Sequence, residues 1–379
     1  MRKIAMVAGE TSGDILGDAI LSALCPKVPD AVLYGIGGRR MESRGFSSKW
    51  PMEKLAVNGL FEVLAHFREI KNIRNGLRNL IIADHPDVFV GIDAPEFNLG
   101  LEVQLREAGI KTVHVVSPSI WAWRSGRIKT IAKAVSRILV LFPFEETIYQ
   151  KAGIPVTCIG HPLAENIPMQ ADVQGARQEH QLDNGKPVIA ILPGSRMSEL
   201  KYNPAAFIEA ARILLGREPS LQFVVPMAGE RQDAYFKQLL KENRLDQLPL
   251  KIIQGQSQKA IAAADAVLVA SGTATLEVAL LKKPMVIGYR LMWATWQIAR
   301  HIVKPPVGLP NILAGEMIVP ELLQHDATGQ KLADALWYQL TDENNRRNLH
   351  QRFTDMHHSL LRNMAQTSAE AILDVIQNG

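Results

Sequence analysis

The sequence predicts an α/β protein with two doubly wound domains, each built on a parallel sheet. Short runs rich in Val and Ile recur along the chain, and longer segments with helical spacing of apolar residues separate them. This alternation is typical of βαβ units, whose buried parallel strands are almost continuously apolar. A length of 379 residues also suits two domains, each with enough apolar residues for a core of its own.

The expected strands fall into two series. The first covers residues 3–8, 31–36, 87–92, 111–116, 137–142 and 155–160, and the second covers 187–193, 221–226, 250–253, 265–270 and 284–289. Residues 161–186 lie between the series, are polar and rich in turn-forming residues, and indicate the domain connection. After Thr328 the pattern is helical to the end, so we expect this long tail to pack on another part of the chain.

Composition excludes several classes of protein. Cys25 and Cys158 lie far apart and outside any metal-ligand spacing, which argues against disulfides and zinc and favours a reducing compartment. The apolar run after Lys3 is too short for a signal peptide, and no run approaches the roughly 18 residues of a membrane span. A net charge of +4 mildly favours anionic partners. Nucleic acid is not expected, because no base-reading signature is present.

Three loops follow predicted strands at the edge where open parallel sheets bind ligands. They are GETSGD at residues 9–14, LPGSR at 192–196 and SGTATLE at 271–277. Glycine permits close backbone approach, and hydroxyls at a helix start donate beside the positive end of the helix dipole. The second and third loops therefore suit phosphate oxygens, and the predicted contacts are Gly194, Ser195, Ser271, Gly272 and Thr273. The alternative is that the hydroxyls only cap helices; two such loops in one domain favour phosphate.

Arg196 and Glu277 extend this predicted phosphate site. The planar guanidinium of Arg196 matches a diphosphate. Glu277 lies one turn into the following helix, where its carboxylate could accept hydrogen bonds from ribose hydroxyls or only interact with the helix dipole. GIGGRR at 35–40 has Arg40 in place of the third glycine of a dinucleotide fingerprint and follows the second strand, so we reject it as an NAD site. With no Walker loop, HExxH or DxD motif, we expect neither a metal nor a cofactor.

Asp93 is the candidate general base. It ends the third predicted strand within GIDAPEFN, residues 91–98, and Pro95 constrains the loop that follows. A carboxylate at this edge suits proton abstraction. The alternative is a cap on the helix that begins near Pro95, and the residues alone favour that alternative. Four histidines have no visible partners and are expected to be structural: His114, His161, His357 and His358.

A segment at residues 56–82 has the composition of a membrane-surface helix. Apolar side chains surround its first half, so packing on one sheet cannot bury them all, and a basic stripe follows. This combination is typical of a helix lying on anionic lipid. The predicted membrane contacts are Phe61, Val63, Leu64, Phe67, Arg68, Lys71 and Arg74. Residues 289–304 are a weaker candidate, and a core helix or a subunit contact is the alternative for both.

Six motifs in order resemble the lipid-A-disaccharide synthase family over essentially the whole chain. They are GETSGD, VGIDAPEFN, VSPSIWAWR, LPGSR, ASGTATLE and LPNILAG. The resemblance implies a GT-B architecture, in which two Rossmann-like domains face a cleft and the final helices return to the first domain. The implied division is an acceptor domain at 1–165, a UDP-sugar domain at 166–342 and a helical tail at 343–379 that packs on the first domain.

The resemblance also implies the reaction. An inverting glycosyltransferase would move 2,3-diacylglucosamine from UDP to the 6-hydroxyl of 2,3-diacylglucosamine 1-phosphate, giving the β-1,6-linked lipid A disaccharide 1-phosphate and UDP. The implied location is the cytoplasm, peripheral on the inner face of the inner membrane, with an anionic phospholipid surface as partner. A homodimer is left open.

Residue by residue, Asp93 and Arg196 match positions that the family treats as essential, and Asn311 falls in its third cleft motif. The resemblance implies that the GETSGD loop lines the cleft opposite the UDP site. Its glycines would let the loop approach the sugar, and its polar side chains would contact sugar oxygens. The residues concerned are Gly9, Glu10, Thr11, Ser12 and Gly13, and Glu10 and Asp14 can either hold the loop or accept hydrogen bonds from sugar hydroxyls. Two rival functions remain open at this point: an enzyme of the same fold with a soluble UDP-sugar substrate, and a nucleotide sensor or membrane adaptor without turnover.

Overall fold

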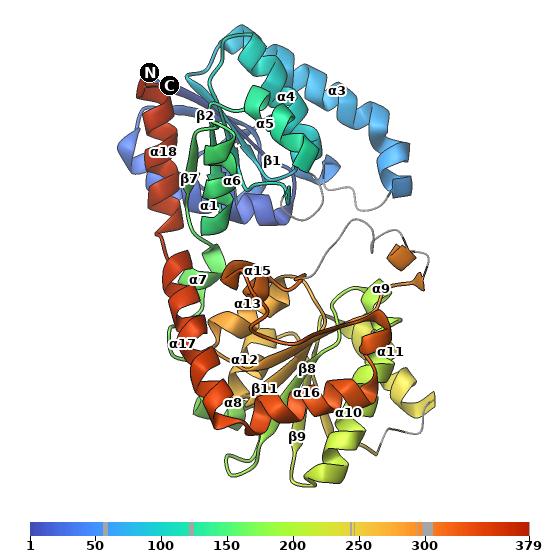
Figure 1. Ribbon diagram of the computed structural model, residues 1–379. Coiled ribbons are helices and arrows are strands. Elements are labelled where there is room, and N and C mark those ends of the chain that lie inside the picture. The colour runs from blue at the N-terminus through green and yellow to red at the C-terminus, as the bar shows by residue number, and fades with distance from the viewer. Residues whose placement is uncertain are drawn as a thin grey trace. The chain divides into compact units, whose positions relative to one another are not determined.

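The computed structural model describes residues 1–55, 60–120, 125–242, 245, 247–293, 295–297 and 306–378, without the side chains of 60–67 and 125. The chain forms two compact units (Figure 1). Unit 1 comprises Met1–Pro162 together with Ser359–Gly379, and unit 2 comprises Leu163–His358.

Unit 1 contains a parallel sheet with the strand order β3-β2-β1-β4-β5-β6-β7. The strands are β1 (Lys3–Ala8), β2 (Val32–Ile36), β3 (Ser47–Ser48), β4 (Val88–Ile92), β5 (Thr112–Val115), β6 (Arg137–Val140) and β7 (Val156–Cys158). Strand order reverses between β1 and β4, so the loops that follow these two strands flank the point where such sheets bind ligands.

Helices cover both faces of the unit 1 sheet, as in a doubly wound fold. They are α1 (Thr11–Leu24), α2 (Arg39–Glu42), α3 (Leu60–Asp84), α4 (Pro95–Glu107), α5 (Ile128–Ala134), α6 (Pro143–Lys151) and α18 (Met364–Asn378), with short 3-10 turns at Cys25–Lys27, Met52–Lys54 and Ser125–Arg127. Helix α18 packs along α1, and α3 and α5 pack on α4. Apolar side chains of α1, α3, α4 and α18 join those of the strands in one core.

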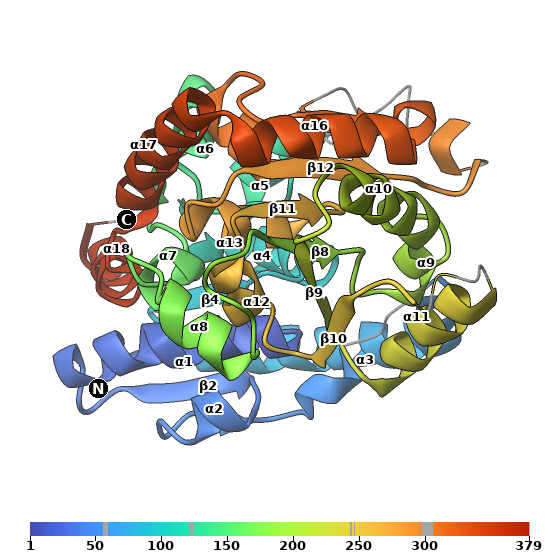
Figure 2. The ribbon, with the colours of Figure 1, turned by 90° about the horizontal axis from the view of Figure 1, so that it is seen from below.

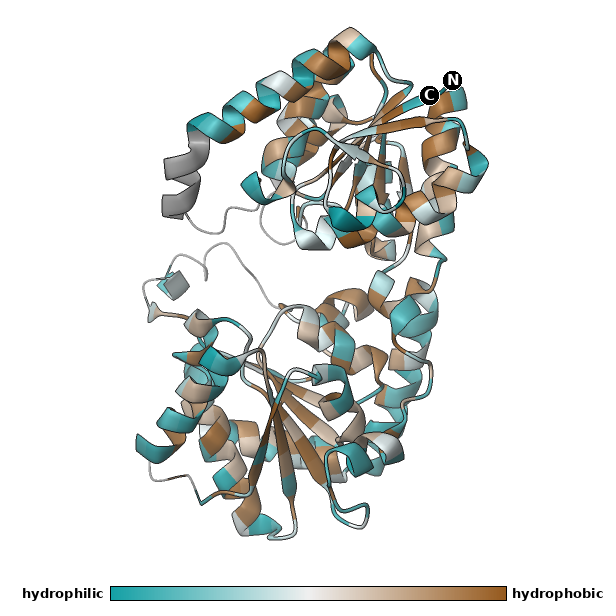
Figure 3. Cartoon of the chain, turned by 180° about the vertical axis from the view of Figure 1, so that it is seen from behind, coloured by the Kyte–Doolittle hydropathy of each residue, from teal (hydrophilic) through white to brown (hydrophobic). Residues whose placement is uncertain are grey.

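Unit 2 repeats the arrangement with the strand order β10-β9-β8-β11-β12-β13. The strands are β8 (Val188–Leu192), β9 (Gln222–Met227), β10 (Leu250–Gln254), β11 (Ala266–Val269), β12 (Met285–Tyr289) and β13 (Glu321–Leu323). They are parallel, and order reverses between β8 and β11. Their apolar character is plain in Figure 3, where the strands are largely brown. The predicted phosphate loops follow these two neighbouring strands.

The helices of unit 2 lie on both faces of its sheet. They are α7 (Pro162–Asn166), α8 (Val173–Glu179), α9 (Met197–Leu200), α10 (Pro204–Arg217), α11 (Glu230–Glu242), α12 (Ser257–Ala263), α13 (Thr273–Leu280), α15 (Leu309–Ala314), α16 (Gly329–Thr341) and α17 (Glu343–Leu360), with a 3-10 turn at Gln324–Asp326. Helices α10 and α16 run side by side over one face, and α8 and α12 cover the other (Figure 2).

The predicted strands are all present, with bounds that differ by at most two residues at either end. Two strands were not predicted, β3 and β13, which have two and three residues. The predicted connection at 161–186 contains α7 and α8, and the boundary between units falls near its start, after Pro162.

The final helices divide between the two units. Helix α17 belongs to unit 2 as far as His358, whereas α18 belongs to unit 1. His357 attaches the end of α17 to the rest of unit 2. It is fully buried; its Nδ1 lies 2.5 Å from Lys282 Nζ, and its Nε2 lies 2.7 Å from the carbonyl oxygen of Ala164. The boundary therefore lies within the predicted tail, about one helix later than its predicted start at 343.

Candidate active site

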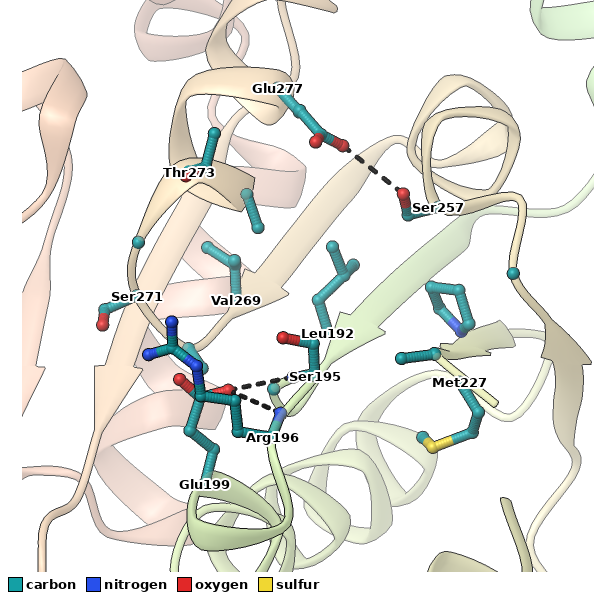
Figure 4. Close-up of a pocket in the computed structure, with 17 residues that line it drawn as sticks. Leu192, Ser195, Arg196, Glu199, Met227, Ser257, Val269, Ser271, Thr273 and Glu277 are labelled. Carbon is teal, nitrogen blue, oxygen red and sulfur yellow. Dashed lines mark hydrogen bonds between the residues drawn. The ribbon is translucent and has the colours of Figure 1, made fainter. Parts of the chain in front are cut away.

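A cavity of about 360 Å³ lies at the switch point of unit 2 (Figure 4). It is formed by the loops after β8 and β11 and by residues that follow β9 and β10. Its size suits a nucleotide-sized ligand. Seven predicted residues line it: Gly194, Ser195, Arg196, Ser271, Gly272, Thr273 and Glu277. The switch-point geometry thus brings together two loops that are about 75 residues apart in sequence.

The predicted loop hydroxyls do not cap the helices. The residue at the N-cap of α9 is Arg196, and the one at the N-cap of α13 is Gly272; neither position has a side-chain cap hydrogen bond. Ser195 and Thr273 are exposed, and Ser271 is half-buried. The hydroxyls of Ser195 and Thr273 are therefore available to a ligand in the cavity, whereas that of Ser271 is in hydrogen-bond contact with Tyr289.

Glu199 already occupies the backbone donors of the LPGSR loop. Its Oε2 accepts hydrogen bonds from the amides of Ser195 at 2.9 Å and Arg196 at 3.2 Å. Gly194 has φ +122°, and a Cβ there would lie 2.5 Å from Glu199 Cβ. The Glu199 carboxylate thus occupies the position where an anion would bind the loop. The amides of Ser195 and Arg196 are therefore not free donors in this structure.

The N-terminus of α13 offers free donors instead. Gly272 has φ +85°, and its carbonyl accepts hydrogen bonds from the amide and the hydroxyl of Thr275, at 3.1 and 2.8 Å. Within the described part of the chain, the amides of Thr273 and Ala274 have no partner, as is usual in the first turn of a helix. Both residues line the cavity. An anion there would meet free amides and the positive end of the helix dipole.

Glu277 lies on the far side of the same cavity. Its Oε2 accepts a hydrogen bond of 3.4 Å from Ser257 Oγ, and burial raises the pKa of its carboxyl group. Sequence reasoning did not single out Ser257, Met227 or Glu199, although all three line the cavity. The position of Ser257 and Met227 beside the carboxyl ends of predicted strands was an available signal.

In unit 1 the GETSGD loop and the Asp93 loop are neighbours. Ala8 pairs with Ile92 at the ends of β1 and β4, so Gly9 and Asp93 follow adjacent strands. A Cβ on Gly9 would lie 2.8 Å from Ala94 Cβ, and one on Gly13 would lie 3.3 Å from Ala8 Cβ. A side chain at Gly9 would therefore displace Ala94 on the neighbouring loop, whereas one at Gly13 would be tight against Ala8.

Asp93 sits in a constrained turn. It has φ +51° and the next residue, Ala94, has φ +43°, a conformation that non-glycine residues seldom adopt. The N-cap of α4 is Ala94, without a side-chain cap, and in the described structure the Asp93 carboxylate has no hydrogen-bond partner. The capping alternative for Asp93 is therefore not what the structure shows.

A buried cluster of three polar side chains, Asn98, Glu102 and His114, supports this turn. Asn98 Nδ2 donates to the carbonyl oxygen of Asp93 at 2.9 Å, and one helical turn later Glu102 Oε1 lies 2.8 Å from His114 Nδ1. All three side chains of the cluster are fully buried, and burial raises the pKa of Glu102. Gly91 makes room for the carboxylate, because a Cβ there would lie 2.1 Å from Glu102 Oε1.

The polar residues of GETSGD divide into two groups. Glu10, Thr11 and Ser12 are exposed where α1 begins, so they are available to a ligand. Asp14 is buried, and its carboxylate accepts hydrogen bonds from the amides of Gly38, Arg40 and Met41 at 3.0 to 3.2 Å. Asp14 therefore organises the GIGGRR loop.

Asn311 lies outside the unit 2 cavity and is fully buried. Its Nδ2 donates to Val319 O at 2.9 Å and Glu321 Oε1 at 2.8 Å, and its Oδ1 accepts from the amides of Ile318 and Val319. Because these bonds use the whole carboxamide, the structure gives Asn311 a positioning role for the chain after α15. Its predicted contact with substrate stays a prediction.

Comparison with known proteins identifies the family. The profile of the lipid-A-disaccharide synthetase family matches residues 4–374. The chain is 51% identical over 377 residues to the lipid-A-disaccharide synthase of Paraburkholderia phymatum, covering 99% of this chain and 96% of that protein. It is 52% identical over 378 residues to the enzyme of Burkholderia mallei, covering 99% and 97%. The chain belongs to the lipid-A-disaccharide synthase family. It is therefore a glycosyltransferase.

Solved structures agree with this assignment at the level of fold. The glycosyltransferase of kitacinnamycin superposes with a TM-score of 0.63 at 15% identity, covering 98% of both chains. A UDP complex of MnaA from S. aureus superposes with a TM-score of 0.59 at 13% identity, covering 100% of this chain and 96% of that one. Lipid-A-disaccharide synthase relatives and these structures together support two parallel α/β units of the GT-B type.

The segment predicted to lie on a membrane surface belongs to helix α3, Leu60–Asp84, as far as the structure describes it. Of the predicted contacts, Arg68 and Lys71 are exposed, and Arg74 is half-buried with Nη1 3.3 Å from the position of a Cβ on Gly100. The apolar part of the prediction lies outside the described side chains: Phe61, Val63, Leu64 and Phe67. Half of the weaker candidate at 289–304, residue 294 and residues 298–304, lies outside the described residues as well.

Over the described residues, no group of three or more His, Cys, Asp and Glu side chains is placed to hold a metal ion. No helix in that same part of the chain is both long and apolar enough to cross a membrane.

Proposed function

We propose that this glycosyltransferase moves 2,3-diacylglucosamine from UDP to the 6-hydroxyl of 2,3-diacylglucosamine 1-phosphate. The products are the β-1,6-linked disaccharide 1-phosphate and UDP. Family membership supports the reaction, and the observation that carries the assignment of the donor site is the cavity at the unit 2 switch point, with Arg196, Thr273 and Glu277 in its lining. Unit 2 is then the UDP-sugar domain and unit 1 the acceptor domain.

The donor diphosphate fits the N-terminus of α13 better than the LPGSR amides. The Thr273 and Ala274 amides are free, whereas Glu199 occupies the amides of Ser195 and Arg196. The exposed guanidinium of Arg196 lines the same cavity and can neutralise the charge that grows on the leaving diphosphate. Glu277 can accept hydrogen bonds from the ribose. The UDP bound in the structure of S. aureus MnaA is consistent with this class of ligand.

The acceptor hydroxyl needs a base, and Asp93 has the required properties. Its carboxylate is half-buried at the switch point of unit 1 and has no competing partner in the described structure. In the proposed step the 6-oxygen attacks the anomeric carbon, the bond from that carbon to the UDP oxygen breaks, and the hydroxyl proton passes to Asp93. One displacement of this kind inverts the anomeric centre. Glu10, Thr11 and Ser12, exposed beside this turn, are the proposed sugar contacts.

Both proposed substrates carry acyl chains, so the enzyme has a reason to present a helix to the membrane surface. We propose that α3 rests on anionic phospholipid at the cytoplasmic face of the inner membrane. Arg68 and Lys71 are exposed on it. Basic residues near an anionic surface contribute about 1 kcal/mol each. The apolar residues of the first half would insert between the acyl chains.

The test is to incubate purified protein with UDP-2,3-diacylglucosamine and the 1-phosphate acceptor in EDTA, and to look for disaccharide and UDP. We expect product without metal, because hydrogen-bond donors and Arg196 can stabilise the diphosphate. Loss of activity in EDTA with rescue by Mg²⁺ would contradict the metal-free mechanism. UDP release without disaccharide would point to a different acceptor.

Two variants separate the proposed roles. Asp93→Asn should keep nearly normal UDP affinity and lose roughly 10²- to 10⁴-fold in kcat, the usual contribution of general-base catalysis. Arg196→Ala should weaken UDP binding by roughly 10- to 100-fold, because a charged hydrogen bond contributes about 1.5–3 kcal/mol. Calorimetric titration with UDP, turnover rates and a thermal melt make the comparison. Wild-type turnover by Asp93→Asn would remove Asp93 from the mechanism, and normal UDP affinity of Arg196→Ala would move the diphosphate elsewhere.

A further inference from the structure

A second cavity in unit 2, of about 450 Å³, lies at the opposite end of the sheet from the UDP-sugar cavity. Residues just before β11 and β12 form one side of it, and the first two turns of α17 form the other. The lining residues are Ala264, Asp265, Lys282, Lys283, Pro284, Glu343, Arg346, Arg347 and His350. None of them belongs to the proposed catalytic machinery.

The charges around this cavity do not balance. Two lysines and two arginines face two carboxylates, with His350 at the rim. Asp265 already has other partners. Its Oδ2 accepts hydrogen bonds from Arg177 Nη2 at 2.8 Å and from the amide of Val188 at 2.8 Å. Within the described chain, Lys283 and Arg346 have no ion pair. The net positive charge is therefore concentrated on groups that share one hollow.

The position of the two lysines in this cavity is energetically unfavourable. Lys282 is 7% exposed, has φ +56°, and its Nζ lies 2.5 Å from His357 Nδ1, which supplies no negative charge. Burial lowers the pKa of Lys282 to about 8, and it does the same for Lys283, with Arg177 and Arg346 adding to the effect and Asp265 opposing it. Lys283 is half-buried. Cations that are buried or half-buried without a counter-ion are unfavourable. An anion in the cavity would stabilise all of them at once.

The start of α17 supplies the two arginines of this cavity. Asp342 precedes the helix, and its Oδ1 accepts a hydrogen bond from the amide of Asn345 at 2.7 Å, so a carboxylate already occupies this helix end. Arginine presents donors in a fork that matches phosphate oxygens, and lysine adds a compact charge. Four cations around a cavity of this volume are the features of a phosphate site.

We propose that this cavity binds a phosphate-bearing anion, held by Lys282, Lys283, Arg346 and Arg347, at a site separate from the UDP-sugar cavity. The phosphate group can belong to a soluble phosphate or diphosphate compound or to an anionic lipid headgroup. The two sources share the same recognition chemistry, and the arms of the experiment separate them.

The first arm titrates the full-length protein with inorganic diphosphate by calorimetry. Lys283→Gln/Arg346→Gln should weaken the binding at least tenfold. The matched control, Lys129→Gln/Lys133→Gln, removes two exposed lysines of α5 and should leave binding unchanged. Arg196→Ala separates the two cavities: binding that survives it and disappears in Lys283→Gln/Arg346→Gln belongs to this site. A thermal melt checks that the double variant folds, which we expect because it removes repulsion.

The second arm uses the pH dependence of sulfate binding, because sulfate keeps its charge between pH 6 and 9. An anion binds the protonated lysines more tightly, so sulfate affinity should fall at least threefold as the pH rises from 7 to 9, through the pKa of about 8 for both lysines. The other charged or titratable groups around the lysines are Asp265, Glu343, Arg177, Arg346, Arg347, His350 and, against Lys282, His357. Burial lowers the pKa of His357, so its imidazole stays neutral over this range. An affinity that does not change over this range would contradict the proposal.

The third arm adds vesicles of phosphatidylglycerol, with phosphatidylcholine as the neutral control. Weaker vesicle binding by Lys283→Gln/Arg346→Gln than by the control variant would identify a lipid headgroup as the source of the phosphate. Weaker diphosphate binding with unchanged vesicle binding would identify a soluble compound. If the double variant binds both probes like the wild-type protein, or if Arg196→Ala alone abolishes all diphosphate binding, the proposal is wrong.

Discussion

The imidazole of His161 shows how one buried side chain couples the stability of unit 1 to pH. It is 8% exposed, and its ring lies 5.4 Å from that of Phe142 in a stacked arrangement. Burial lowers its pKa from 6.5 to about 4. Protonation of the native state is therefore disfavoured, whereas the unfolded chain binds the proton near pH 6.5.

We predict that unit 1 loses stability as the pH falls from about 6.5 to 4, by up to about 3 kcal/mol from this group. Stability is fully present above pH 6.5, because His161 is then neutral in both states. His161→Gln should flatten the dependence of the melting temperature on pH over this window, and His85→Asn, at an exposed position, should not. Equal slopes in the wild-type protein and His161→Gln would show that other groups dominate.

At the scale of elements, the sequence was sufficient wherever burial made a strand apolar. The strands β1, β4, β8 and β11 carry long apolar runs, and the loops after them were predicted as sites because parallel strands end at a common edge. Strands β3 and β13 are too short and too exposed to leave such a pattern. Strand order, which makes β1 adjacent to β4 and β8 adjacent to β11, required the tertiary structure.

The contacts inside the sites were less predictable than the loops. That Glu199 would hold the LPGSR amides, or that the carboxamide of Asn311 would be used within the protein, depends on backbone conformations that no spacing rule specifies. The same holds for Asp93, whose left-handed turn replaced the expected cap. Gly91 is a further case, since a Cβ there would meet Glu102 and Asn98, which both lie on another element.

For helix α3 we predict that replacing Phe61, Val63, Leu64 and Phe67 with serine leaves a folded protein that binds anionic vesicles less. Side chains that contact lipid contribute to vesicle binding and little to folding. A core role gives the opposite result, because large-to-small changes in a packed interior cost about 2–5 kcal/mol each. Thermal melts and vesicle sedimentation decide between them. An unfolded quadruple variant would show that the segment is core.

At the scale of the whole molecule, unit 1 is built from both ends of the chain. Helix α18 follows more than 190 residues of unit 2, yet its buried side chains belong to the same core as β1 and α1. They are Met364, Ala369, Ala371, Ile372 and Val375. Unit 1 therefore cannot complete its core until the last helix is made, whereas the residues of the proposed UDP-sugar cavity all lie within unit 2.

This division predicts different effects for two similar core substitutions. Ile372→Ala, at a fully buried site in α18, should destabilise unit 1 by about 2–5 kcal/mol and leave UDP affinity unchanged. Leu336→Ala, at a site in α16 that is 1% exposed, should destabilise unit 2 by a similar amount. A ligand raises only the transition of the unit that binds it, so UDP should offset the loss in Leu336→Ala and not that in Ile372→Ala. Calorimetric melts with and without UDP make the measurement. If UDP raised the transition lowered by Ile372→Ala as much as that lowered by Leu336→Ala, the two units would unfold as one, and the assignment of UDP to unit 2 would need direct titration of both variants.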